Sequence, residues 1–292
     1  MKKILLICLS AVFILSFFGC DTIQKNNITK PQQTDSPTAT TVATEAHAET
    51  STSSVNAGTL NPAKPEDAVK IYQQNYSFWQ IDPDSIRMSM DGYYYLFLDL
   101  DFDGILELIA TEFHGSGRYS KNNFYRISDD KTTVELIPFD ESVDENNQCD
   151  LFFEDSPVLY KNNTTGNYEY IFCDYIRAGG GMDYFREEEY SYKDGKICAT
   201  PLFAYEVIQA EVSESGEKEE YFTLFNLDET SEVDKETYDN AIKNFESQRT
   251  NLDLDIETID GNDYHQATEI QKYAMLLEAY EDFEFDGFKF ED

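Results

Sequence analysis

Apolar side chains between residues 65 and 79 recur with the spacing of an α-helix. Those that share one helical face are Ala68, Val69, Tyr72, Tyr76 and Trp79. Pro65 suits the first turn of a helix, and Glu66 and Asp67 are favourable at its positive end. The pattern therefore predicts a helix that begins at Pro65 and ends before Asp82-Pro83.

After Asp82-Pro83 the pattern becomes that of β-strands. Asp91-Gly92 predicts a tight turn between strands at 86–90 and 93–98. Further strands are predicted at residues 105–113, 123–127, 133–138, 157–160, 168–176 and 221–224. Turns at 179–181 and 194–195 join strands of an antiparallel meander that runs to about residue 210.

Helical spacing returns towards the C-terminus. Two helices are predicted from two apolar stripes, which are Tyr238, Ala241, Ile242 and Phe245, and then Ala267, Ile270, Ala274 and Leu277. Asp234 and Asp263 are the expected N-caps of these helices. The predicted fold class is α+β, an antiparallel β-sheet meander with an N-terminal helix and a C-terminal helical pair.

The N-terminus has the layout of an export signal. Lys2 and Lys3 precede an apolar run over residues 4–18, which is too short to span a membrane comfortably. A small residue then precedes Cys20, and this ending resembles the lipobox of bacterial lipoproteins of the Gram-positive type, with Phe17 where Leu is usual. The resemblance implies cleavage before Cys20 and lipidation (palmitate) of that cysteine, which would hold the protein at the extracytoplasmic face of the cell membrane. The alternative is an ordinary signal peptide with a chance cysteine.

Composition separates a tether from a folded part. Residues 20–64 contain no aromatic side chain, and Ser, Thr and Ala dominate residues 34–58 without apolar periodicity. Such a segment buries too little surface to offset the entropy of ordering it. We therefore expect a signal peptide at 1–19, a lipidated and disordered tether at 20–64, and a single acidic globular domain at 65–292.

Charge narrows the choice of partners. The chain has 57 acidic and 22 basic residues, a formal net charge of −35. Phosphate neutralisation needs clustered Lys and Arg, so the composition argues against nucleic-acid binding and against electrostatic docking on an anionic membrane. A cationic peptide or protein is the partner that this charge would suit.

One acidic segment has a spacing typical of cation binding. Its carboxylates stand at positions 1, 3, 5 and 9, which are Asp99, Asp101, Asp103 and Glu107. Odd spacing in a tight loop turns these oxygens towards a common centre, and Gly104 permits the bend. The carbonyl of Ile105 would supply another ligand. Oxygen ligands favour a hard divalent ion, Ca²⁺ above all.

The segment is not a complete EF-hand, because position 12 is Ala110 and the flanks look like strands. It resembles the Asp-x-Asp-x-Asp-Gly calcium loops between strands in FG-GAP and VCBS-type repeats, and single-copy versions in cell-surface lipoproteins. Propeller architecture does not follow from one loop. The alternative is a solvated acidic turn whose aspartates cap loop amides. Two weaker copies, at 253–257 and 282–287, are interpreted as surface acidic runs.

Motifs for catalysis are weak. Only His114 and His265 lie in the predicted domain, and neither a nucleophile elbow nor a His-Glu-x-x-His zinc motif occurs. Gly115-Ser116-Gly117 is better explained by a glycine-rich turn than by a nucleophile. We therefore assign no catalytic residue.

Three cysteines, Cys149, Cys173 and Cys198, remain beside Cys20 in the exported chain, and their spacing does not suggest zinc or thioredoxin chemistry. Either Cys173 and Cys198 form a disulfide across the meander, or the cysteines are small buried apolar residues.

Together these patterns predict a lipid-anchored extracytoplasmic binding or envelope-associated protein with a calcium-stabilised domain. One alternative is a secreted hydrolase that uses a pair of carboxylates on glycans. The other is a structural lipoprotein without a ligand.

Overall fold

The computed structural model describes residues 60–83, 92–114, 119–141, 143, 157–177, 181–210, 213, 215–226, 229–286, 288 and 290. The predicted signal peptide, Cys20, most of the tether, the strand at 86–90 and Cys149 lie outside these residues. Among the described helices, none is both long and apolar enough to cross a membrane.

The first of two large sheets has five strands in the order β13-β1-β2-β3-β4, and every pairing in it is antiparallel. Its strands are β1 (Gly92–Leu98), β2 (Glu107–His114), β3 (Tyr119–Ile127), β4 (Val134–Ile137) and β13 (Ile259–Asp260). β1 to β4 follow one another in the chain, as the alternating pattern predicts, whereas β13 returns from the C-terminal region to pair with β1.

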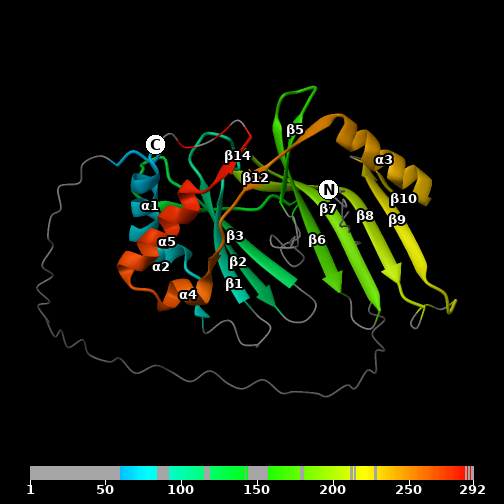
Figure 1. The fold of residues 1–292 in the computed structure, drawn as a ribbon, viewed down its shortest axis with the longest axis horizontal. Helices are drawn as coiled ribbons and strands as arrows, with labels where there is room; N and C mark the ends of the chain where they lie inside the picture. The colour runs from blue at the N-terminus through cyan, green and yellow to red at the C-terminus, as the bar shows by residue number, and fades with distance from the viewer. Residues whose placement is uncertain are drawn as a thin grey trace, which may run out of the picture. The chain divides into compact units, whose positions relative to one another are not determined.

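Four helices cover one face of this sheet (Figure 1), and they are α1 (Pro65–Gln74), α2 (Tyr76–Trp79), α4 (Gly261–Gln266) and α5 (Glu269–Glu281). The helix predicted from Pro65 is broken at Asn75, whose side-chain amide donates to the Ile71 carbonyl oxygen at 2.8 Å. The indole N–H of Trp79 donates to the Tyr72 carbonyl oxygen at 2.8 Å. Both bonds fold the short α2 back onto the end of α1.

The second large sheet has seven strands in the antiparallel order β10-β9-β8-β7-β6-β5-β11. They are β5 (Val158–Asn162), β6 (Tyr168–Arg177), β7 (Met182–Lys193), β8 (Lys196–Ile208), β9 (Glu219–Asn226), β10 (Glu229–Val233) and β11 (Arg249–Leu252). Asp194 and Gly195, both with positive φ, form the predicted turn between β7 and β8. α3 (Lys235–Ser247) packs Tyr238 and Ile242 against Phe203 and Phe222 of this sheet.

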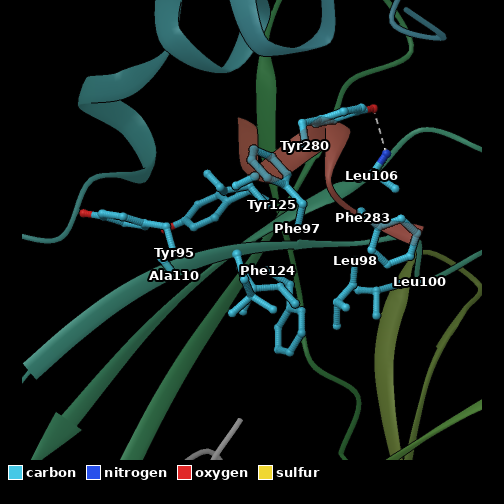
Figure 2. Close-up of a cluster of buried hydrophobic side chains, with 14 of the residues drawn as sticks. Tyr95, Phe97, Leu98, Leu100, Leu106, Ala110, Phe124, Tyr125, Tyr280 and Phe283 are labelled. Carbon is cyan, nitrogen blue, oxygen red and sulfur yellow. Dashed lines mark hydrogen bonds between the residues drawn. The ribbon is translucent and has the colours of Figure 1, made fainter. Parts of the chain in front are cut away.

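An aromatic core joins the two sheets. Phe124 of β3 lies 6.4 Å from Tyr190 of β7, measured between ring centroids, and Phe172 of β6 lies 4.9 Å from Tyr190. Figure 2 shows the part of this core that lies under the helices, where Phe97, Tyr280 and neighbouring apolar side chains meet. The observed fold is therefore α+β, with antiparallel sheets, an N-terminal helix and C-terminal helices, as predicted.

The C-terminal helices differ from the prediction in two details. Asp234 caps α3 as expected, by accepting a bond from the Thr237 N–H, but Asp263 is not a cap. Asp260 caps α4 instead, and Thr268 caps α5 through a capping box.

The predicted apolar stripe on the last helix is also wrong. Ile270 is 83% exposed, while α5 buries Leu276, Ala279 and Tyr280. This helix carries apolar side chains on more than one face, so spacing alone did not select the face that packs.

Of the two alternatives for the cysteines, a disulfide between Cys173 and Cys198 does not form. Cys173 lies on β6 opposite Glu187 of β7, whereas Cys198 lies on β8 opposite Ser191 of β7. A whole strand separates the two cysteines, and they are also offset along it. A disulfide requires Cα atoms within about 7 Å, which this register does not allow.

Candidate metal centre

The acidic segment is the connection between β1 and β2. β1 ends at Leu98, which pairs directly with Glu107 at the start of β2. Because the strands are antiparallel, this register returns the carboxylate at position 9 to the side of the carboxylate at position 1. The predicted strand at 105–113 begins two residues later than expected, since Ile105 and Leu106 belong to the loop.

Hydrogen bonds to its own carboxylates shape the loop. The two Asp99 carboxylate oxygens accept from the N–H groups of Asp103 and Gly104, each at 3.0 Å. Glu107 Oε2 accepts from the N–H of Leu100 at 2.8 Å. Gly104 has a φ of 83°, which favours glycine there, and Phe102 also adopts a positive φ, of 59°. These bonds fold the segment into a compact turn around the acids.

Three of the four predicted carboxylates converge. Asp99, Asp101 and Glu107 each place one carboxylate oxygen within 4.8 Å of the others, and this group could hold a metal ion. Asp99 and Glu107 are only 1% and 5% exposed, whereas Asp101 is exposed. The structure therefore brings together two buried acids and one that faces solvent.

Asp103 has a different place from the other acids. Its Oδ1 accepts from the N–H of Ile105 at 2.8 Å, as in an Asx turn, and its carboxylate is not in the converging group. Capping of loop amides is what the alternative of a solvated acidic turn predicted, and Asp99 and Asp101 cap loop N–H groups as well; Asp103 differs in that it caps without joining the converging group. Ile105 lies half-buried in the same turn.

Two tyrosines from distant helices hold the end of the loop. The N–H of Leu106 donates to the Tyr280 hydroxyl of α5 at 3.0 Å, as the dashed line in Figure 2 marks. The Tyr72 hydroxyl of α1 donates to the Leu106 carbonyl oxygen at 2.8 Å. Both backbone groups of Leu106 are therefore bonded inside the core, which fixes the residue that precedes Glu107. Local sequence contains no sign of these contacts.

Phe102, at the tip of the loop, inserts between other aromatic rings. Its ring stacks on Tyr170 of β6 at a centroid distance of 5.4 Å and an interplanar angle of 9°. It lies 5.0 Å from Tyr168 and 6.3 Å from Phe285. The loop thus packs against the seven-stranded sheet and the C-terminal region as well as its own sheet.

Burial makes the charges of this centre costly. Burial raises the pKa of Asp99 to about 7, helped by the negative charges of Asp103 and Asp101 and opposed by the Gly104 N–H. Burial also raises the pKa of Glu107 well above its usual range, and the charges of Asp101 and Asp99 add to this effect. For Asp101, which is exposed, partial desolvation and then the negative charge of Asp103 raise the pKa. A proton or a cation must compensate carboxylates in this setting.

The two weaker acidic copies meet elsewhere in the fold. β12 (Leu254–Asp255) pairs with β14 (Glu284–Phe285), which sets Asp255 opposite Glu284. An open depression of about 710 Å³ lies there, lined in part by Asp253 and Asp286. In the described part of the chain, only the group in the 99–107 loop has acidic, His or Cys ligand atoms close enough together for a metal.

The structure describes the side chain of one of the two histidines predicted to lie in the domain. His265 is exposed on α4, and the side chain of His114 and residues 115–117 lie outside what the structure describes.

Comparisons of the chain with protein-family models, curated proteins and solved structures found no match. The likeness of the 99–107 loop to calcium loops of FG-GAP and VCBS-type repeats therefore stays a prediction.

The raised pKa of Asp99 predicts that, without divalent ions, the free energy of unfolding falls as the pH rises towards neutral. The folded protein keeps a proton on Asp99 up to about pH 7, whereas the unfolded chain releases it near the ordinary value of 3.8. The stabilisation that comes from this retained proton is complete below about pH 4 and is lost as the pH rises towards 7. The free energy of unfolding therefore falls by up to about 4 kcal/mol over this range.

Urea unfolding in a chelator, measured from pH 4 to pH 8, checks this expectation. Asp99→Asn is the control and should make the curve shallower, while Glu107 and Asp101 keep part of the dependence. A free energy of unfolding that rises over this range in the unaltered protein would contradict it.

Proposed function

We propose that the 99–107 loop binds one Ca²⁺ ion, and that this ion stabilises the folded domain of a lipid-anchored, extracytoplasmic binding or envelope-associated protein. The observation that carries the proposal is the convergence of carboxylate oxygens from Asp99, Asp101 and Glu107 within 4.8 Å, with two of these acids buried.

The ligand type favours calcium among the divalent ions. The converging group contains oxygen ligands alone, without histidine or cysteine. Ca²⁺ accepts six to eight oxygen ligands in flexible geometry, so carboxylates, loop carbonyls and water can together complete its shell. Zinc prefers nitrogen and sulfur ligands, and magnesium keeps most of its waters.

Burial supports a stabilising role for the ion over a catalytic one. Asp99 and Glu107 lie inside the molecule, and the apolar neighbours Leu100 and Leu106 are buried on either side. Of the three converging acids, Asp101 alone faces solvent, so a substrate has little access to the ion. An ion here would neutralise the buried acids and hold the β1–β2 turn against the core.

The location of the protein is proposed from its N-terminal segment. The lipobox-like ending at Cys20 and the aromatic-free segment at 20–64 support a lipid anchor with a tether in front of the domain. The net charge of −35 would attract a cationic peptide or protein by electrostatics, and that attraction would weaken as salt is added.

Calcium titration with two matched variants tests the ion. Calorimetry on the unaltered protein should show saturable binding at one site, and calcium should raise the melting temperature, because only the folded state holds the ion. Asp101→Asn should weaken binding at least tenfold, since one anionic ligand is lost. Asp253→Asn, in the acidic depression, should leave affinity unchanged.

Either an absence of calcium binding or equal weakening by both variants would refute the assignment of the ion to this loop.

The anchor has its own test. Replacing Cys20 by Ala removes the sulfur that would carry the lipid, so the exported protein should move from the membrane fraction to the soluble fraction. Incorporation of a palmitate analogue should disappear with it. A Cys20→Ala protein that stays in the membrane fraction and still takes up the label would rule out this anchor.

A further inference from the structure

Tyr170 brings the seven-stranded sheet to the edge of the acidic loop. It lies on β6, opposite Tyr190 of β7, and is only 1% exposed. Its ring stacks on Phe102, which stands in the loop between Asp101 and Asp103. A residue more than 60 positions along the chain thus packs on the tip of the loop that carries the candidate centre.

The hydroxyl of Tyr170 makes no hydrogen bond to a side chain among the described residues, and the backbone of Asp99 is the polar group close enough to lower its pKa slightly. The hydroxyls of Tyr72 and Tyr280, which also reach this loop, both bond to Leu106. A buried hydroxyl without a partner is costly, and in a native protein it usually marks a group whose partner is an ion, a water or a rearranged side chain.

The negative charges that act on the Tyr170 hydroxyl are those of two candidate ligands, Asp99 and Glu107. Burial, followed by the negative charges of Asp99 and Glu107, raises the pKa of Tyr170 well above its usual range. The phenol therefore keeps its proton and can only be a donor towards these carboxylates. Each carboxylate offers about four acceptor sites, and the loop N–H groups account for two at Asp99 and one at Glu107.

We propose that Tyr170 is a positioning residue of the cation site, whose hydroxyl donates one hydrogen bond to a carboxylate oxygen of Asp99 or Glu107 when these acids hold the ion. This inference rests on the proposed calcium site and adds a contribution from the second sheet. Hydrogen-bond partners of metal ligands orient the ligands, and removing one typically weakens metal binding by 10- to 100-fold.

The arrangement also couples the ion to the packing of the two sheets. Asp99 and Glu107 belong to the five-stranded sheet and its loop, while Tyr170 belongs to the seven-stranded sheet. An ion that orders these carboxylates therefore also fixes a contact between the sheets.

Tyr170→Phe tests the proposal, because it removes the hydroxyl and keeps the ring that stacks on Phe102. The matched control is Tyr264→Phe, which removes another buried hydroxyl without a partner, among Tyr76, Trp79 and Tyr95 of the helix-covered face. Calcium affinity is measured by calorimetry on the purified protein, the ion-free melting temperature by calorimetric scanning, and the tyrosine environment by near-ultraviolet difference spectra on adding calcium.

We expect Tyr170→Phe to weaken calcium binding at least tenfold, to leave the ion-free melting temperature unchanged, and to lose most of the calcium-induced tyrosine signal. Tyr264→Phe should keep the affinity and the signal. If the unaltered protein binds calcium and Tyr170→Phe binds it equally well, the role of Tyr170 is refuted while the calcium site stands. If the unaltered protein binds no calcium, the proposed function fails, and this inference fails with it.

Discussion

The connection between β1 and β2 depends on how two buried carboxylates are compensated. Asp99 and Glu107 are almost completely removed from water. One carboxylate oxygen of Asp101 lies within 4.8 Å of a carboxylate oxygen of each. Three loop N–H groups offset part of this charge through hydrogen bonds. The remaining negative charge requires either a proton or a cation. Because the pKa of Asp99 is raised to about 7, Asp99 would hold a proton at mildly acidic pH, whereas a cation would be favoured at neutral pH.

Contacts from the rest of the structure hold this loop in place, and with it the three converging acids. The Leu98–Glu107 register fixes both ends of the turn. Tyr72 and Tyr280 hold both backbone groups of Leu106, and Phe102 lies among aromatic rings from β6 and β14. A preorganised set of oxygens binds an ion more tightly than a mobile set, because less ordering entropy is lost on binding.

Much of the fold followed from local patterns, since alternation marks a half-buried strand and Pro65 marks a helix start. The odd spacing of Asp99, Asp101 and Glu107 likewise predicted a common centre, which the structure confirms for these three. Spacing did not separate Asp103, which caps Ile105, from the three acids that converge, and it did not predict which face of α5 would pack. Contacts such as Tyr280 with Leu106 join residues 174 positions apart, and only tertiary packing determines them.

The most direct test of the central claim is a crystal structure of the protein grown with calcium, with anomalous scattering used to locate the ion. The account predicts a single strong anomalous peak in the 99–107 loop, with oxygens of Asp99, Asp101 and Glu107 at about 2.3–2.6 Å from it. An ion-free loop at neutral pH, in which these carboxylates share protons with one another, would contradict it.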